Sequence, residues 1–342
     1  MATVGTTEGT RSGHGAAHAR RTARAAALLA AAVTVSLAAG CTSGQGDDGR
    51  TPVTPTPSAS TAPSPSRSAP TATGPVLAVK IDNVPAARPQ TGLNAADIVY
   101  VEQVEGGLSR LMAVYATAFP QSVGPVRSAR ESDLELLRQF DEPTLAFSGA
   151  QGKLLPAIDS APVHAEPPGA APDAYTRSTD RSSPHNLYLR PDRLIPRPPG
   201  VAALTTGFRF GPAPAGGTPV NSRTVHYPSA GFTFTWSRQR ERWLVAMDGR
   251  EATTTDAGAL DPATVVVQHV GIRESAYHDS LGNHTPYTET VGSGTAEVLR
   301  DGKAYDARWD RPDAASGTRF TTEDGKPLDF ATGQVWVVYV QE

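Results

Sequence analysis

The sequence predicts an α/β (α+β) N-terminal domain followed by a mostly antiparallel β C-terminal domain. Between residues 76 and 215, apolar segments of strand length are separated by segments with a helical pattern. Several of these strands are apolar on both faces, as strands covered by helices are. Beyond residue 219 the hydrophobic period is two almost throughout, and turn signals such as Asp248-Gly249 separate the segments. We therefore expect two domains, 76–215 and 216–342, with the boundary near Ala215.

The first forty residues have the pattern of an export signal. A basic segment with Arg20, Arg21 and Arg24 precedes an apolar run that ends in small residues directly before Cys41. This pattern predicts a lipoprotein signal peptide at residues 1–40 with Cys41 as the lipidated residue. An ordinary secretory signal with an incidental cysteine is the alternative. The Arg20-Arg21 pair leaves the export route open between the general secretory and the twin-arginine systems.

Residues 41–75 are expected to form a disordered tether between the membrane and the folded domains. Of the 34 residues from Thr42 to Pro75, 24 are Pro, Ser, Thr or Gly, so the segment buries too little apolar surface to fold. The apolar run before Cys41 is shorter than the ~20 residues of a membrane-spanning helix. The lipid would therefore anchor the protein to the cell membrane at its extracytoplasmic face.

The cysteine and charge content exclude several kinds of site. Cys41 is the only cysteine, so a chain lipidated there has no disulfide and no cysteine metal site. Without residues 1–40 the chain keeps 27 basic and 33 acidic residues, which argues against nucleic-acid binding. We predict no cofactor and no metal site. His278, Asp279 and His284 have metal-binding side chains, but their Gly- and Ser-containing surroundings favour solvated loop residues.

A predicted β-hairpin carries the charges nearest to a candidate site. Its strands are expected at 97–104 and 108–119. Gly106-Gly107 joins them, because glycine accepts the positive φ angles of a two-residue turn. In this register Gln103 faces Arg110, and Glu105 lies diagonally from Arg110 on the same face. An acid and a base would therefore share one side of the sheet.

A helix is expected directly after this hairpin. Ser128 and Glu131 have the spacing of a capping box, so the helix should begin at Ser128 and end near Phe140. Arg127 and Arg130 would flank its N-terminus, where free N–H groups and the helix dipole favour anions. The pattern therefore predicts an anion-binding site.

The remaining elements follow the same two periodicities. In the first half, strands are expected at 76–81 and 144–147, and short helices at 153–158 and 201–205. In the second half, strands are expected at 224–227, 232–236, 243–247, 264–272, 287–291, 295–299, 303–309, 319–322 and 335–340.

Several short blocks of the sequence occur in a recognisable order. They are Ile81-Asp82-Asn83, Ala87-Arg88-Pro89-Gln90-Thr91-Gly92-Leu93, Ala96-Asp97-Ile98-Val99-Tyr100, Glu105-Gly106-Gly107, Gly124-Pro125-Val126-Arg127-Ser128-Ala129-Arg130 and Pro184-His185-Asn186-Leu187-Tyr188. In this order they resemble the YerB-like bacterial lipoproteins, a family of unknown function. The second half is similar to the C-terminal β domain of that family, notably at 264–268, 291–294 and 333–336. The resemblance implies an envelope lipoprotein with two domains, and it supplies no catalytic residues.

The charged and polar residues of these segments are the candidate site residues. Those expected to bind a ligand are Arg127, Arg130, Arg110, Ser128, Asn83 and Asn186. The candidates for a catalytic role, which the sequence does not assign, are Glu105, Asp82 and His185. Each has a structural alternative, such as an ion pair between Glu105 and Arg110, a turn at Asp82-Asn83, or a loop fixed by His185.

Three functions follow from this set of residues. The first is a tethered binding protein for an anionic envelope component, such as a cell-wall polymer or a phosphate- or carboxylate-bearing glycan or lipid-linked precursor. The second is an envelope enzyme, a glycopolymer transferase or hydrolase, acting on such a ligand. The third is a scaffold that recruits another envelope protein. An enzyme should bring Arg127, Arg130 and an acid into one cleft, whereas a scaffold should leave them paired on separate surfaces.

Overall fold

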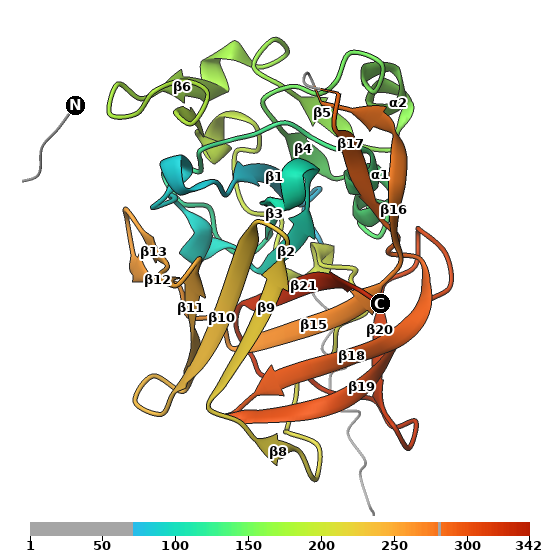
Figure 1. Ribbon diagram of the computed structural model, residues 1–342. Coiled ribbons are helices and arrows are strands. Elements are labelled where there is room, and N and C mark those ends of the chain that lie inside the picture. Colours follow the sequence, from blue (N-terminus) through green and yellow to red (C-terminus); the bar gives the residue numbers. More distant parts are fainter. Residues whose placement is uncertain (1–70, 280–281) are drawn as a thin grey trace, which may run out of the picture. The chain divides into compact units, whose positions relative to one another are not determined.

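The computed structural model describes residues 71–279 and 282–342, and in these residues the main feature is a mixed sheet of eleven strands. The sheet takes strands from both halves of the sequence (Figure 1). In spatial order its strands are β20 (Arg319–Thr322), β19 (Lys303–Arg311), β18 (Gly292–Arg300), β15 (Thr264–Val270), β21 (Val335–Gln341), β2 (Ile98–Gln103), β3 (Ser109–Tyr115), β1 (Leu77–Asp82), β4 (Thr144–Ala146) and β5 (His164–Glu166), with β8 (Thr218–Pro219) paired to β19.

Strand β21 joins the two halves of this sheet. It pairs in parallel with β2 on one side, where Ile98 lies opposite Val335, and in parallel with β15 on the other, where Thr264 lies opposite Val335. Strands from the two expected domains thus belong to one sheet. The boundary near Ala215 stays a prediction.

A second sheet covers one face of the first. Its strands are β12 (Arg250–Glu251), β11 (Arg242–Met247), β10 (Ala230–Ser237) and β9 (Ser222–Tyr227), all antiparallel. Every second residue of β11, from Trp243 to Met247, is buried, as the predicted period of two requires. Phe234 of β10 meets Trp336 of β21 edge to face at 6.1 Å between ring centroids. The prediction of mainly antiparallel strands in the second half is confirmed.

The first half of the chain has a mixed sheet but few helices, so the prediction of an α/β domain is only partly correct. Its α-helices are α1 (Glu131–Leu137) and α2 (Leu155–Ser160). Strands β1 to β3 are apolar on both faces because the second sheet covers one face, while the other packs on α1, α2 and aromatic side chains of the second half. A strand that is covered on both faces has the same apolar sequence pattern whether helices or a second sheet cover it.

Short elements complete the described chain. They are the strand pairs β6 (Tyr175–Arg177) with β7 (Leu187–Leu189), β13 (Thr253–Thr254) with β14 (Gly258–Ala259), and β16 (Ile272–His278) with β17 (His284–Thr288), and the 3-10 turns Pro85–Ala87, Leu93–Ala95, Glu105–Gly107, Pro172–Ala174, Pro191–Arg193 and Val201–Ala203.

The predicted register of the β2–β3 hairpin is wrong by one residue. Glu102, not Gln103, lies opposite Arg110. Gly106 and Gly107 do have positive φ angles, of 67° and 70°, but they belong to a 3-10 turn that begins at Glu105, so the connection is longer than two residues. Because side chains alternate between faces, the difference puts Glu102 on the face that carries Arg110.

The predicted helix start at Ser128 is also wrong. Helix α1 begins at Glu131, and the carboxylate of Asp133 accepts the N–H of Arg130 at 2.6 Å. The chain before it stays extended because Arg127 N–H donates to the carbonyl of Lys80 in β1. Helix α1 has only seven residues and carries two acidic side chains in its first turn, so it does not provide the expected anion site.

Arg311 of β19 ties the second half of the chain to α1. It is fully buried, and its guanidinium donates to the carbonyls of Glu135 and Leu136 at the C-terminal end of the helix. It also donates to the carbonyls of Ala314 and Ser316 and to the hydroxyl of Thr290. One side chain therefore connects the end of the helix, whose carbonyls also accept from Arg138 N–H and Gln139 Nε2, with a loop.

Candidate functional site

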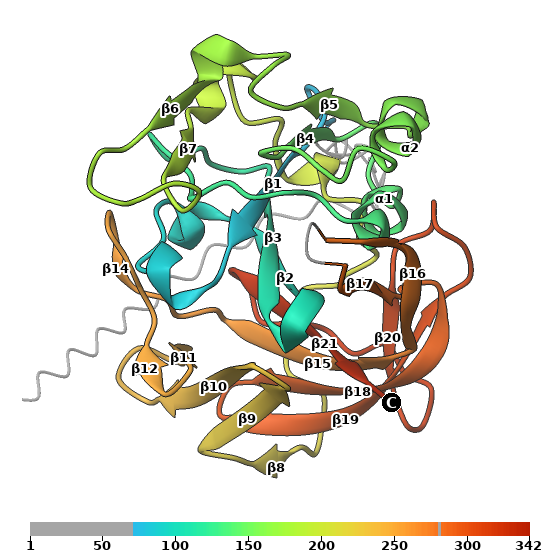
Figure 2. The ribbon, with the colours of Figure 1, turned by 45° about the horizontal axis from the view of Figure 1, so that its top comes forward.

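A cavity of about 670 Å³ lies where the β2–β3 turn, residues 127–131 and the β16–β17 hairpin meet. Figures 1 and 2 show this hairpin beside α1, and the hydroxyl of Tyr287 donates to Glu135 of the helix at 2.8 Å. The cavity is lined by the three arginines expected at the site, Arg110, Arg127 and Arg130, and we call it the arginine pocket.

Arg130 is held by Glu105. The Nε and Nη2 atoms of Arg130 donate to the two carboxylate oxygens of Glu105 at 2.6 and 2.7 Å, and Thr285 of β17 donates to the same carboxylate at 2.6 Å. Burial favours the neutral acid, but the hydrogen bonds and charge of Arg130 hold the pKa of Glu105 below its ordinary value. Glu105 is thus an ionised counter-charge of the pocket.

Arg127 shares a carboxylate with His185. Its Nε atom lies 3.1 Å from Oδ2 of Asp82, and His185 Nδ1 lies 2.8 Å from the same oxygen. Asp82 is almost completely buried, while Arg127 and His185 are partly exposed. The contact between Arg127 and Asp82 is an ion pair without hydrogen-bond geometry, because Arg127 Nε has no hydrogen-bond partner. Asp82 thus contacts both Arg127 and His185 through the same carboxylate oxygen, beside the pocket.

Arg110 differs from the other two arginines in its partners. Its Nη1 atom donates to the carbonyl of Ser128 at 3.1 Å, and among the described residues no carboxylate oxygen lies within ion-pair distance of its guanidinium. Burial, together with the charges of Arg130 and Arg127, lowers the pKa of Arg110 to about 9. Burial and the two neighbouring arginines thus disfavour the charge of Arg110, while Glu105 and Asp82 offset part of this effect.

Beneath the arginines lies a cluster of charges, Lys80, Glu102 and Asp133, that we call the buried charge cluster. Lys80 Nζ is 2.5 Å from Glu102 and 2.6 Å from Asp133, and all three side chains are at most 1% exposed. Although burial lowers it, the two carboxylates keep the pKa of Lys80 above its usual value. Burial raises the pKa of Glu102 to about 7 despite the nearby ammonium. The other oxygen of Asp133 accepts the N–H of Arg130, so the cluster also holds the pocket in place.

The two expected asparagines do not line the arginine pocket. Asn83 donates to the hydroxyl of Ser109 and accepts from Arg88 and Gln90. Asn186 accepts from Arg177 and donates to the carbonyl of Ser178 at the β6–β7 pair. Both side chains therefore fix loops, and Ser128 contributes its main-chain carbonyl to Arg110.

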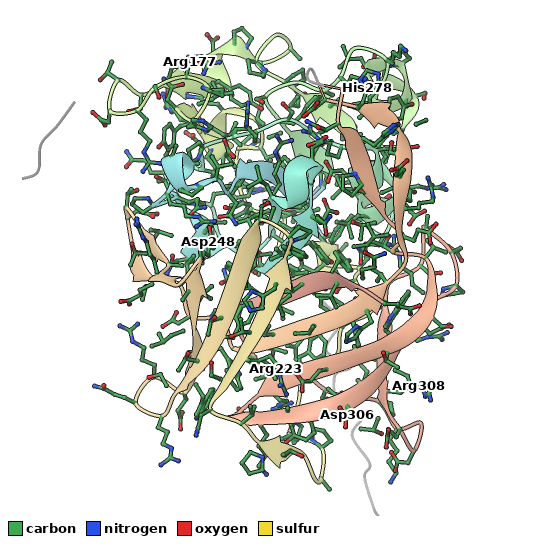
Figure 3. All side chains as sticks on the ribbon, in the orientation of Figure 1. Arg177, Arg223, Asp248, His278, Asp306 and Arg308 are labelled. Carbon is green, nitrogen blue, oxygen red and sulfur yellow. The ribbon has the colours of Figure 1, made fainter. Side chains whose placement is uncertain are left out.

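Part of the pocket was not predicted from the sequence. It comes from residues outside the short blocks that resemble the YerB-like family in the first half of the chain. Gln151 follows β4, and Tyr277, His278 and Thr285 belong to the β16–β17 hairpin. Figure 3 shows His278 at the end of this hairpin. Among the described residues no group of three His, Cys, Asp or Glu side chains is placed to hold a metal ion. No local sequence signal indicates these contacts, because the hairpin is more than 140 residues from Arg130.

The membrane-related predictions lie outside the described part of the chain. Cys41, the signal segment and the tether up to residue 70 are not described, and these expectations stay predictions. Within residues 71–279 and 282–342, no helix has both the length and the apolar character needed to cross a bilayer.

Comparison with known proteins identifies the family. Residues 61–199 match "Protein of unknown function (DUF3048) N-terminal domain", and residues 223–337 match the corresponding C-terminal domain. The chain belongs to the DUF3048 family. A relative from Bacillus subtilis (strain 168), named "Putative lipoprotein YerB", is 27% identical over 283 residues, covering 78% of this chain and 81% of that protein. The resemblance to YerB-like lipoproteins is thus confirmed.

The DUF3048 fold is also seen in a crystal structure. The structure of YerB protein from Bacillus subtilis matches this chain with a TM-score of 0.64 at 21% identity, over 78% of this chain and 90% of that one. The three arginines of the pocket lie in the N-terminal DUF3048 region, whereas Tyr277 and Thr285 lie in the C-terminal region. Both DUF3048 regions therefore build the pocket.

Proposed function

We propose that this protein is a lipid-anchored envelope protein that binds an anionic cell-envelope component through the arginine pocket. The observation that carries the proposal is Arg110, a largely buried guanidinium with no carboxylate partner among the described residues, between Arg127 and Arg130. Guanidinium groups bind phosphate and carboxylate through paired N–H donors. An anion between the three arginines would relieve their mutual repulsion.

The charges next to Arg110 support an anionic ligand. Arg130 has Glu105 and Arg127 has Asp82 as ion-pair partners, whereas Arg110 has none among the described residues. Glu131 and Asp279 also line the pocket and carry negative charge, so the anion is expected between the three arginines and not elsewhere in the pocket. The volume of about 670 Å³ falls within the range of sites for small molecules. The site therefore suits a small anionic group carried on a larger molecule.

Replacing Arg110 by methionine should weaken phosphate binding about ten- to a hundredfold, because a charge-assisted contact contributes roughly 1.5–3 kcal/mol. The fold should persist, since Arg110 makes one hydrogen bond and its charge is opposed by two others. Calorimetry and melting temperature with inorganic phosphate, on the full chain in detergent, measure the effect. The control is Arg308→Met, which removes an exposed arginine from β19, well separated from His278 in Figure 3. Equal phosphate affinity in both variants, or no effect of phosphate on the wild type, would contradict the proposal.

The lipid anchor rests on the signal pattern before Cys41 and on the relative named as a lipoprotein. Cys41→Ala should release the protein from the membrane or leave it as unprocessed precursor, because the thioether link to lipid needs the cysteine sulfur. Fractionation of cells and the mass of the product measure both outcomes. Processed Cys41→Ala protein that stays in the membrane fraction would rule out this anchor.

A further inference from the structure

The wall of the arginine pocket contains a buried acceptor without a hydrogen-bond partner, Oε1 of Gln151. Arg127 Nε also lacks a hydrogen bond, but it already lies 3.1 Å from Oδ2 of Asp82 in an ion pair. Buried polar atoms are nearly always paired in folded proteins, so an unpaired atom in the wall of a cavity calls for an explanation. A ligand that has only acceptor oxygens can pair with the arginines but cannot donate to Gln151. The arginines and Gln151 together match a ligand that carries both acceptors and a donor.

Gln151 can turn toward a ligand at little cost. Its Oε1 has no partner to lose, and its Nε2 lies 3.5 Å from Nδ1 of His278, at the outer limit of a hydrogen bond. The residue is partly exposed and precedes α2, outside the main sheet. If the side-chain amide rotates, its oxygen, which has no partner, therefore gains a hydrogen bond to the ligand.

The remaining wall mixes polar and aliphatic side chains, which suits the hydroxyl groups and the apolar faces of a sugar ring. The lining residues include Ser109, Ser128, Thr285 and Tyr277 as well as the aliphatic Val84, Val104, Leu108 and Leu154. Side chains with both donor and acceptor capacity suit a ligand covered with hydroxyl groups. The cavity is also much larger than a phosphate group alone requires, so a ring next to the phosphate has room.

We infer that the arginine pocket binds a sugar that carries a phosphate group, with the arginines on the phosphate and Gln151 accepting a hydroxyl or acetamido N–H of the ring. This inference rests on the proposed anion-binding function and names its ligand class. It assigns to Gln151 the recognition of the sugar, and to Arg110, Arg127 and Arg130 the recognition of the charge. The two contributions are separable by mutation.

The experiment compares methyl phosphate with glucose 1-phosphate and N-acetylglucosamine 1-phosphate by calorimetry on the full chain in detergent. We expect at least one sugar phosphate to bind at least about tenfold more tightly than methyl phosphate, a difference of about 1.4 kcal/mol. Gln151→Leu should remove this gain, so that sugar phosphates bind to the variant no more tightly than methyl phosphate does. The matched control is Gln121→Leu, an exposed glutamine outside the pocket, which should keep the gain. Gln151→Ala repeats the test with a smaller side chain, and the melting temperature of each variant shows that it is folded.

The possible outcomes separate this inference from the proposed function. If all three phosphates bind equally to the wild type, or if Gln151→Leu and Gln151→Ala keep the preference for sugar phosphates, the sugar inference is overturned and the anion site stands. If glucose and N-acetylglucosamine without phosphate bind as tightly as their phosphates, the division of roles between Gln151 and the arginines is wrong. If no phosphate binds, the proposed function itself fails.

Discussion

Lys80→Met is expected to lower the free energy of unfolding by about 3–5 kcal/mol, a large part of the total stability of a typical domain. The substitution removes the only ammonium of the buried charge cluster and leaves Glu102 and Asp133 facing each other without a cation in the core. A methionine fills a similar volume, so the effect comes from charge and not from a cavity. Urea unfolding followed by circular dichroism measures it.

Lys326 provides a matched control for Lys80. Lys326 Nζ also lies 2.6 Å from a carboxylate, that of Asp324, but both side chains are largely exposed. Lys326→Met should therefore change the free energy of unfolding by less than about 1 kcal/mol. Adding Glu102→Gln to Lys80→Met should restore part of the loss, because only one buried carboxyl group then remains without a cation. A Lys80→Met protein as stable as the wild type would show that the cluster does not depend on the ammonium.

Arg311→Met is expected to destabilise the protein by about 3 kcal/mol, because Thr290 Oγ1 and the carbonyls of Ala314 and Ser316 lose a donor, and each buried acceptor left without one costs about 1–3 kcal/mol. The guanidinium donates to four carbonyls and one hydroxyl while it is fully buried, and methionine offers none of these donors. The loss should appear first at the C-terminal end of α1 and in the loop at 313–316. Urea unfolding gives the magnitude, and hydrogen exchange of these two segments gives the location.

Arg319 serves as the corresponding control. It pairs with Asp310 at 2.6 Å on the surface, where its side chain is 70% exposed, so Arg319→Met should have a small effect. Arg311→Lys should recover only part of the stability, because an ammonium cannot reach as many acceptors as the planar guanidinium. Equal stability of Arg311→Met and Arg319→Met would show that the buried carbonyls find other donors.

The elements with strong local patterns could be predicted from the sequence. Alternating burial in β11 follows the predicted period of two, and Gly106-Gly107 marks the end of β2 because both residues need positive φ angles. The register of β2 against β3 could not be predicted in the same way. A turn one residue longer is compatible with the same glycines, and the choice depends on the buried partners Lys80 and Asp133 of Glu102.

Part of the candidate site could also be predicted, because several of its residues are close together in the sequence. Arg110, Arg127 and Arg130 are close in sequence to the hairpin and α1, so local reasoning could bring them together. The contribution of Gln151 and of the β16–β17 hairpin depends on tertiary contacts that leave no local pattern. Charged residues inside mostly apolar strands, Lys80 in β1 and Glu102 in β2, were the available signals for the buried charge cluster.

The position of β21 has a consequence for how the chain reaches its native state. A ribosome makes β21 after every strand that it pairs with, yet β21 lies between β2 and β15 in the middle of the sheet. Until it arrives, both neighbours present rows of unpaired N–H and C=O groups, the kind of edge at which chains aggregate. Pairing of Ile98 with Val335 closes a very long loop, which slows folding. We therefore expect the two DUF3048 regions to complete their common sheet only after β21 is made, and a chain that stops before β21 lacks the centre of the sheet rather than its edge.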